Sequence, residues 1–89
     1  MLSEWGKLSL FLEQYDPESI VKENRIFELG ENKTNRRIIR IYLSELCKAQ
    51  YLKKLENGSY KVVRKVSSSK TISNIMFEGN KQEFQYLKN

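Results

Sequence analysis

The first thirty residues carry two helical patterns of apolar side chains. In the first pattern the apolar residues follow at steps of three and four, which lines one helix face: Trp5, Leu8, Phe11, Leu12 and Tyr15. Ser3 is placed to cap this helix. Asp16 and Pro17 predict its end and also the start of a short second helix, which Gly30 would close in a left-handed conformation. Residues 26–29 also fit a strand.

A third helix is predicted over residues 34–50. Its apolar residues recur on one side by the same helical rule: Ile38, Ile39, Tyr42, Leu43, Leu46 and Cys47. Three polar residues before or within its first turn fit the capping position, namely Asn32, Thr34 and Asn35. We expect the apolar side to face the core and the remaining, largely basic side to face solvent.

The clearest local signal is the pair Asn57 and Gly58 between two strand-like runs, residues 51–56 and 59–66. Both central residues of a type I′ turn need a positive φ, which Asn and Gly tolerate best. The sequence therefore predicts a β-hairpin with a two-residue loop. That loop would set Leu55 opposite Tyr60 and Lys53 opposite Val62.

The tail after the serine run at residues 67–69 admits two structures. Ser69 can cap a helix that contains Ile72, Ile75 and Met76. Alternatively, residues 79 and 80 can form a second hairpin turn that sets Ile75 opposite Phe84. The pattern favours the helix only slightly, so both structures remain open.

The composition excludes most catalytic chemistry. There is no His, and the single Cys47 forbids an internal disulfide or a Cys-rich zinc site. The sequence contains no phosphate-binding glycine loop, no metal-ligand spacing and no nucleophile with a base. We therefore expect no enzymatic activity, no catalytic residue, no metal and no cofactor. The acids Glu13, Asp16 and Glu18 are interpreted as helix caps at the first junction.

Charge is strongly segregated along the 89 residues, which carry a net charge of +5. Residues 1–31 hold three Lys and Arg against seven Asp and Glu, whereas residues 32–65 hold ten against two. Segregation of this kind focuses the electrostatic field on one face. A polyanion is the partner that such a face favours.

Two consecutive segments, Thr34–Leu46 and Tyr51–Val63, resemble the recognition helix and wing of the winged helix-turn-helix superfamily of DNA-binding proteins. They share its polar helix start, its two leucines three residues apart at the helix end, its short turn and its hairpin that closes on an aromatic residue. The resemblance implies an α+β, mostly helical fold of three helices and a two-stranded wing over residues 1–66. Residues 67–89 would form a short linker and a dimerisation segment of the same domain.

The resemblance also implies that helix 34–50 enters the major groove and that the wing follows the backbone or minor groove. Arg36, Arg37 and Arg40 are candidates for base edges, and Asn35 would read adenine or cap the helix. Lys33 and Thr34 would reach phosphates, and Ser44 lies on the same outer face. The wing candidates, which would contact the backbone, are Lys53, Lys54, Asn57, Lys61, Arg64 and Lys65.

The partner predicted from these residues is double-stranded DNA, bound sequence-specifically by a small transcriptional or replication regulator. We expect a homodimer on a pseudo-palindromic site, joined through the first helix and the C-terminal segment. The alternative is a winged-helix module that docks an acidic protein, which an exposed apolar stripe at Ile38 and Ile41 would favour. No apolar run is long enough for a membrane span and no secretory signal is present, which predicts a cytoplasmic protein that is nucleoid-associated when bound to DNA.

Overall fold

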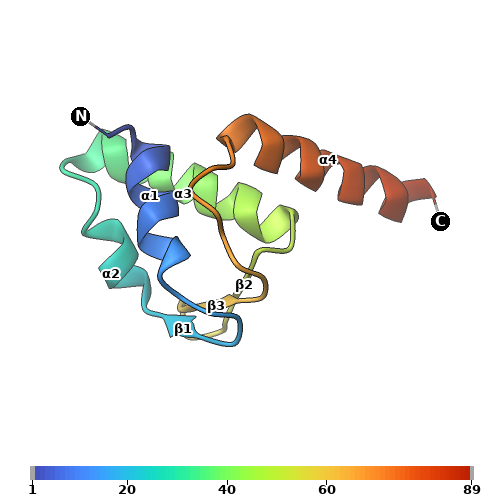
Figure 1. The fold of residues 1–89 in the computed structure, drawn as a ribbon. Coiled ribbons are helices and arrows are strands. Elements are labelled where there is room, and N and C mark those ends of the chain that lie inside the picture. Colours follow the sequence, from blue (N-terminus) through green and yellow to red (C-terminus); the bar gives the residue numbers. More distant parts are fainter. Residues whose placement is uncertain (1, 89) are drawn as a thin grey trace.

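Four helices and a three-stranded antiparallel sheet make up the part of the chain that the computed structural model describes, residues 2–88 for the backbone and 2–81 for the side chains. In chain order these are α1 (Glu4–Glu13), β1 (Ile20–Val21), α2 (Glu23–Phe27), α3 (Lys33–Lys48), β2 (Leu52–Lys54), β3 (Tyr60–Val62) and α4 (Ile72–Lys88). The sheet order is β1-β3-β2 (Figure 1). The α+β class expected from the sequence is confirmed, with about half of the residues helical.

Helix α1 begins where the sequence predicts. The Ser3 side chain accepts a hydrogen bond of 3.0 Å from the Gly6 N–H, which satisfies one of the unpaired donors of the first turn. Trp5, Leu8 and Leu12 are buried on its inner side. The local pattern of α1 and its tertiary packing therefore agree.

The prediction of a second helix that opens at Pro17 is wrong. Residues 16–19 form a turn, in which the Ser19 N–H donates to the Asp16 carbonyl at 3.1 Å, and strand β1 follows it. The turn and β1 are held by β3, since the Glu18 N–H donates to the Val62 carbonyl at 2.7 Å. Helix α2 begins only at Glu23. Sheet pairing with a strand some forty residues away thus overrides the local signal of a proline at a helix start.

Gly30 does not close α2 in a left-handed conformation, and the strand alternative for residues 26–29 is wrong too. The helix ends at Phe27, its capping residue Glu28 is right-handed, and the described glycine with a positive φ is Gly58. Gly30 is buried because α3 passes close to it: a Cβ there would lie 2.6 Å from Arg36 Cγ and 3.0 Å from the Arg36 backbone nitrogen. A close approach, rather than a turn conformation, requires the glycine.

Helix α3 has the predicted inner face and a slightly different start and end. Asn32 is its cap, with the side chain accepting 2.9 Å from the Asn35 N–H, so Thr34 and Asn35 lie inside the helix. Ile39, Leu43 and Leu46 are fully buried. The helix ends at Lys48, two residues before the predicted limit.

The hairpin is present, but its predicted register is wrong by one residue. Lys53 pairs with Lys61, and Lys54 pairs with Tyr60. The Leu55 N–H donates to the Ser59 carbonyl at 2.8 Å, which leaves a loop of three residues, 56–58. Only the last of them, Gly58, has a positive φ (87°), the pattern of a three-residue hairpin loop rather than a type I′ turn.

The tail forms helix α4, so the hairpin alternative for residues 75–84 is excluded; the side chain of Phe84 lies outside the described residues. The predicted cap at Ser69 is wrong, because Thr71 Oγ1 accepts 3.2 Å from the Asn74 N–H. Helix α4 crosses the end of α3 at Gly79, where a Cβ would lie 3.5 Å from the Ala49 nitrogen, an ordinary contact distance. Figure 1 shows the far half of α4 extending away from the rest of the molecule.

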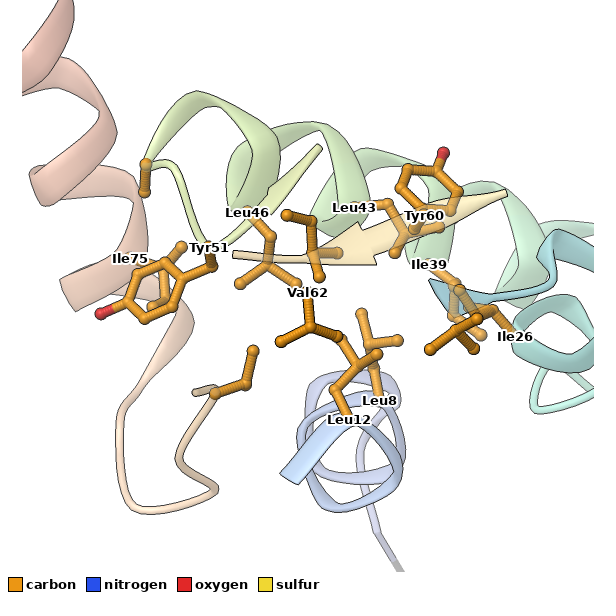
Figure 2. Close-up of a cluster of buried hydrophobic side chains, with 14 of the residues drawn as sticks. Leu8, Leu12, Ile26, Ile39, Leu43, Leu46, Tyr51, Tyr60, Val62 and Ile75 are labelled. Atoms are coloured by element: carbon orange, nitrogen blue, oxygen red, sulfur yellow. The ribbon is translucent and has the colours of Figure 1, made fainter. Parts of the chain in front are cut away.

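A single hydrophobic core joins these elements (Figure 2). Val62 of β3 lies among Leu8 and Leu12 of α1 and the inner residues of α3. Ile26 of α2 closes one end of the core and Ile75 of α4 the other. Since the buried side chains of α3, namely Ile39, Leu43 and Leu46, lie on one side of the helix, its opposite face is left to solvent.

Candidate nucleic-acid interface

The outward face of α3 carries a row of polar and cationic side chains. Lys33, Arg37, Arg40 and Ser44 follow one another at steps of four, three and four residues, and all four are exposed. Residues at these spacings lie above one another on a helix. Within the described part of the chain, no acidic side chain forms an ion pair with Lys33, Arg37 or Arg40. We call these four residues the α3 row.

Helix α2 borders the first half of the α3 row. A cleft between the two helices is lined by Phe27, Lys33, Arg36, Arg37 and Arg40. The Arg40 guanidinium carbon lies 5.1 Å from the centre of the Phe27 ring, within the range of a cation–π contact. Arg36 is also exposed, and its guanidinium donates 3.4 Å to the Gly30 carbonyl. Arg36 thus braces the turn before α3, while Phe27 orients Arg40 at the surface.

The hairpin borders the other half of the α3 row. A second cleft is lined by Arg40, Ser44, Cys47, Lys54 and Tyr60. Lys54 Nζ lies 5.9 Å from the centre of the Tyr60 ring. Burial raises the pKa of Tyr60, as do Cys47 and Glu23, whereas Arg40 lowers it. Burial also raises the pKa of Cys47, with Lys54 opposing it, so both groups stay uncharged at neutral pH.

Four other predicted residues surround this surface. Thr34 is exposed beside the α3 row, and Lys53 is exposed on β2. Asn35 is half-buried and gives its N–H to the cap, so it lies off the row. Asn57 is exposed at the tip of the hairpin, where its side chain accepts 3.0 Å from the Ser59 N–H. Lys54 therefore continues the basic face of α3, whereas Lys53 points to the other side of the sheet, beside Lys61.

The three remaining predicted cations are paired with acids. Lys61 Nζ lies 2.9 Å from Glu18 Oε2, and Lys65 Nζ lies 3.0 Å from Asp16 Oδ1. Arg64 lies 3.2 Å from Glu78 Oε2. The structure thus divides the basic residues of the predicted interface into two groups. Those on α3 and β2 are without an acidic partner in the described part of the chain, and those on or after β3 have one.

Arg64 belongs to a cluster that fastens α4. Its guanidinium stacks 3.8 Å from the centre of the Tyr51 ring and donates 3.2 Å to the Ala49 carbonyl. Tyr51 donates 2.7 Å to Glu78, and Lys70 Nζ lies 2.7 Å from the same carboxylate. Burial would raise the pKa of Glu78, but the hydrogen bonds from Lys70 and Tyr51 outweigh it and lower the pKa. This arrangement gives Arg64 a structural task.

The acidic partners of these cations are not evident from the sequence. The interpretation of Asp16 and Glu18 as helix caps is wrong, because both pair with cations more than forty residues away. Glu13 accepts hydrogen bonds from the backbone and side chain of Ser68, which lower its pKa. The excess of acids before residue 32 is the one signal of such pairing, and it does not identify the partners.

Comparison with protein-family models, with curated proteins and with solved structures finds no match to this chain. Among the described residues, no group of His, Cys, Asp and Glu is arranged to hold a metal ion. In the same part of the chain, no helix has the length and apolar character of a membrane span. The chemistry open to the α3 row is the binding of anionic groups by cations that no neighbouring acid neutralises.

Proposed function

We propose that this chain is a winged-helix protein that binds double-stranded DNA sequence-specifically, as a small transcriptional or replication regulator. The observation that carries the proposal is the α3 row, whose cations face solvent without acidic partners in the described part of the chain. A surface that fixes uncompensated positive charge along one helix matches the phosphates and base edges of a duplex groove.

The order of the elements supports the winged-helix assignment. A helix, a short strand, two helices and a hairpin follow one another, and the short strand joins the sheet beside the second hairpin strand. This agrees with the resemblance of residues 34–46 and 51–63 to a recognition helix and wing. In this arrangement α3 is the helix for the major groove, which is wide enough to admit a helix.

Each cation of the α3 row has a proposed role that follows from its place. Arg37 and Arg40 lie in the middle of the exposed face and suit guanine O6 and N7, which accept two hydrogen bonds from one guanidinium. Lys33 lies in the first turn of α3, where helix N–H groups also favour a phosphate. Lys54, which lines the cleft beside Arg40, and Lys53 on the other side of β2 would add backbone contacts, which give affinity and register but no sequence information.

The proposed active form is a homodimer. Helix α4 extends away from the body and exposes Met76 and Phe77, the latter with 69% of its surface accessible. A second copy would cover these side chains, and two copies would place two α3 helices on the half-sites of a pseudo-palindrome. Phe77→Glu should therefore lower the apparent mass in sedimentation.

One observation favours a second candidate function, docking of an acidic protein. Ile41 is 53% exposed on α3, next to the cationic residues. An apolar side chain among charges suits the centre of a protein interface, although it also suits contact with a thymine methyl group. The same experiment separates the two functions.

The experiment is a salt titration of binding to a random-sequence duplex. The variant is Arg37→Ala/Arg40→Ala, and the control is Lys22→Ala/Arg25→Ala, which removes two exposed cations elsewhere on the surface. We expect a log–log slope steeper than about −3 for the wild type, since each neutralised phosphate contributes about −0.9. The α3 variant should lose roughly one unit of slope per arginine, and the control should lose much less.

Two results would overturn the proposal. The first is the absence of duplex binding by the wild type at about 50 mM salt, where non-specific binding is strongest. The second is an equal loss of salt slope in the α3 variant and in the control, because an equal loss would depend on net charge alone and not on where the cations lie. Either result would shift the assignment to an acidic protein partner.

A further inference from the structure

The turn between α1 and β1 contains a residue in an unfavourable backbone conformation. Pro17 and Glu18 are its central residues, and the Ser19 N–H closes it on the Asp16 carbonyl. Glu18 has a φ of 80°, so the arrangement is that of a type II turn. The third position of such a turn favours Gly or Asn, because a side chain with a Cβ is strained at positive φ. A glutamate here works against the local preference of the backbone.

What the strained position achieves is the placement of two carboxylates. Because the Glu18 N–H donates to the Val62 carbonyl and the Val62 N–H donates to the Ser19 carbonyl, the turn is fixed along β3. Glu18 then reaches Lys61 within β3, and Asp16 reaches Lys65 three residues after it. A strained residue that persists where its charge meets a specific partner points to a functional task.

Lys61 lies on the outer face of the sheet, beside one cation of the proposed wing. Lys61 is directly opposite Lys53 in the hairpin, and Lys53 has no acidic partner in the described part of the chain. Without Glu18, the outer face of the sheet would present two adjacent cations to a phosphate backbone. With Glu18 in place, Lys61 is neutralised and Lys53 is not. The turn of residues 16–19, which we call the acidic turn, thus marks where the unpaired positive charge of the hairpin ends.

We infer that Asp16 and Glu18 are specificity-determining residues that withhold Lys61 and Lys65 from DNA phosphates; this rests on the proposed function. A phosphate contact adds affinity for every sequence equally, whereas the arginines of the α3 row read bases. Two fewer phosphate contacts lower binding to random DNA while leaving base contacts unchanged. The acidic turn therefore raises the share of the binding free energy that depends on sequence.

The test measures binding of a random-sequence 20-base-pair duplex to Glu18→Gln, with Glu45→Gln as the control. Glu45 is half-buried on α3 and has no ion pair among the described residues, so both variants gain one unit of net charge. Freeing Lys61 should steepen the salt slope by about 0.9 and tighten binding by about five- to tenfold near 0.1 M salt. The control should change binding less than about twofold.

Two further variants separate release of the lysine from disturbance of the turn. Glu18→Asn removes the charge and suits the positive φ, so it should bind as tightly as Glu18→Gln and unfold at a higher temperature. Glu18→Gln/Lys61→Gln should return the affinity to that of the wild type, because the released cation is then gone. Asp16→Asn should act as Glu18→Gln does, through Lys65.

Three results would overturn the inference while leaving the proposed function intact, provided that Arg37→Ala/Arg40→Ala still weakens binding. One is equal affinity of Glu18→Gln and Glu45→Gln. Another is a gain that persists when Lys61 is also replaced. The third is a loss of affinity on replacing Lys61 alone that equals the loss for Lys54→Gln, since Lys61 would then already contact DNA. A wild type that binds no duplex would overturn both the inference and the function.

Discussion

The turn between α2 and α3 sets the position of the α3 row, and its tolerance of a methyl group can be calculated from the geometry of Gly30. A Cβ at this position would lie 2.6 Å from Arg36 Cγ, 3.0 Å from the Arg36 nitrogen and 3.1 Å from its Cα. The side chain of Arg36 can rotate away, but the backbone atoms can retreat only if the first turns of α3 shift. Overpacking of this kind costs about 1–3 kcal/mol.

Gly79 provides the matched comparison. Its Cβ would lie 3.4 Å from Lys48 Cβ and 3.5 Å from the Ala49 nitrogen, which are ordinary contact distances. Gly79 is also inside α4, where alanine is favoured over glycine by about 0.5–1 kcal/mol. The same chemical change is therefore expected to destabilise the fold at Gly30 and to leave it unchanged or stabilise it at Gly79.

Urea unfolding followed by far-ultraviolet circular dichroism measures both effects. Gly30→Ala should lower the free energy of unfolding by about 1–3 kcal/mol. In a thermal melt of a domain of this size, each 1 kcal/mol corresponds to a shift of the midpoint temperature by about 4–8 °C. Gly79→Ala should keep or raise the wild-type value. Equal stability of Gly30→Ala and the wild type would refute the close approach of α3, and an equal loss in both variants would refute the distinction between the two sites.

Two further predictions concern the fastening of α4 and the start of α3. The lowered pKa of Glu78 means that its contribution to stability is present above the ordinary value of 4.5 and is lost as the pH falls through the lowered pKa. Glu78→Gln should thus cost about 1 kcal/mol at pH 7 in thermal melts, and the difference from the wild type should shrink below pH 4.5; a constant difference down to pH 2 would contradict this. Asn32→Ala removes the side-chain cap of α3 and should cost about 1 kcal/mol, whereas Asn35→Ala, which keeps the cap, should cost less in the same melts; the reverse order would show that the cap is misassigned.

Several elements follow from the sequence because their signals are local. The apolar steps from Trp5 to Leu12 and the cap at Ser3 specify α1, and the corresponding steps from Ile39 to Leu46 specify the buried side of α3. Gly58 indicates the hairpin, since only a few residues tolerate a positive φ. Once the buried side of α3 is assigned, the charged residues are left on its outward side, so helical spacing is sufficient to predict the α3 row.

The tertiary structure decided the features that depend on distant pairings. Strand β1 exists because residues 20 and 21 pair with β3, and that pairing overrode the helix start signalled by Pro17. The three-residue loop shifted the hairpin register and set Lys53 opposite Lys61. The division of the cations into paired and unpaired groups depends on Asp16 and Glu18. Helical periodicity and turn preferences depend on residues a few positions apart, so they can be recognised in the sequence. An ion pair depends on the distance between two side chains in space, which only the folded chain fixes.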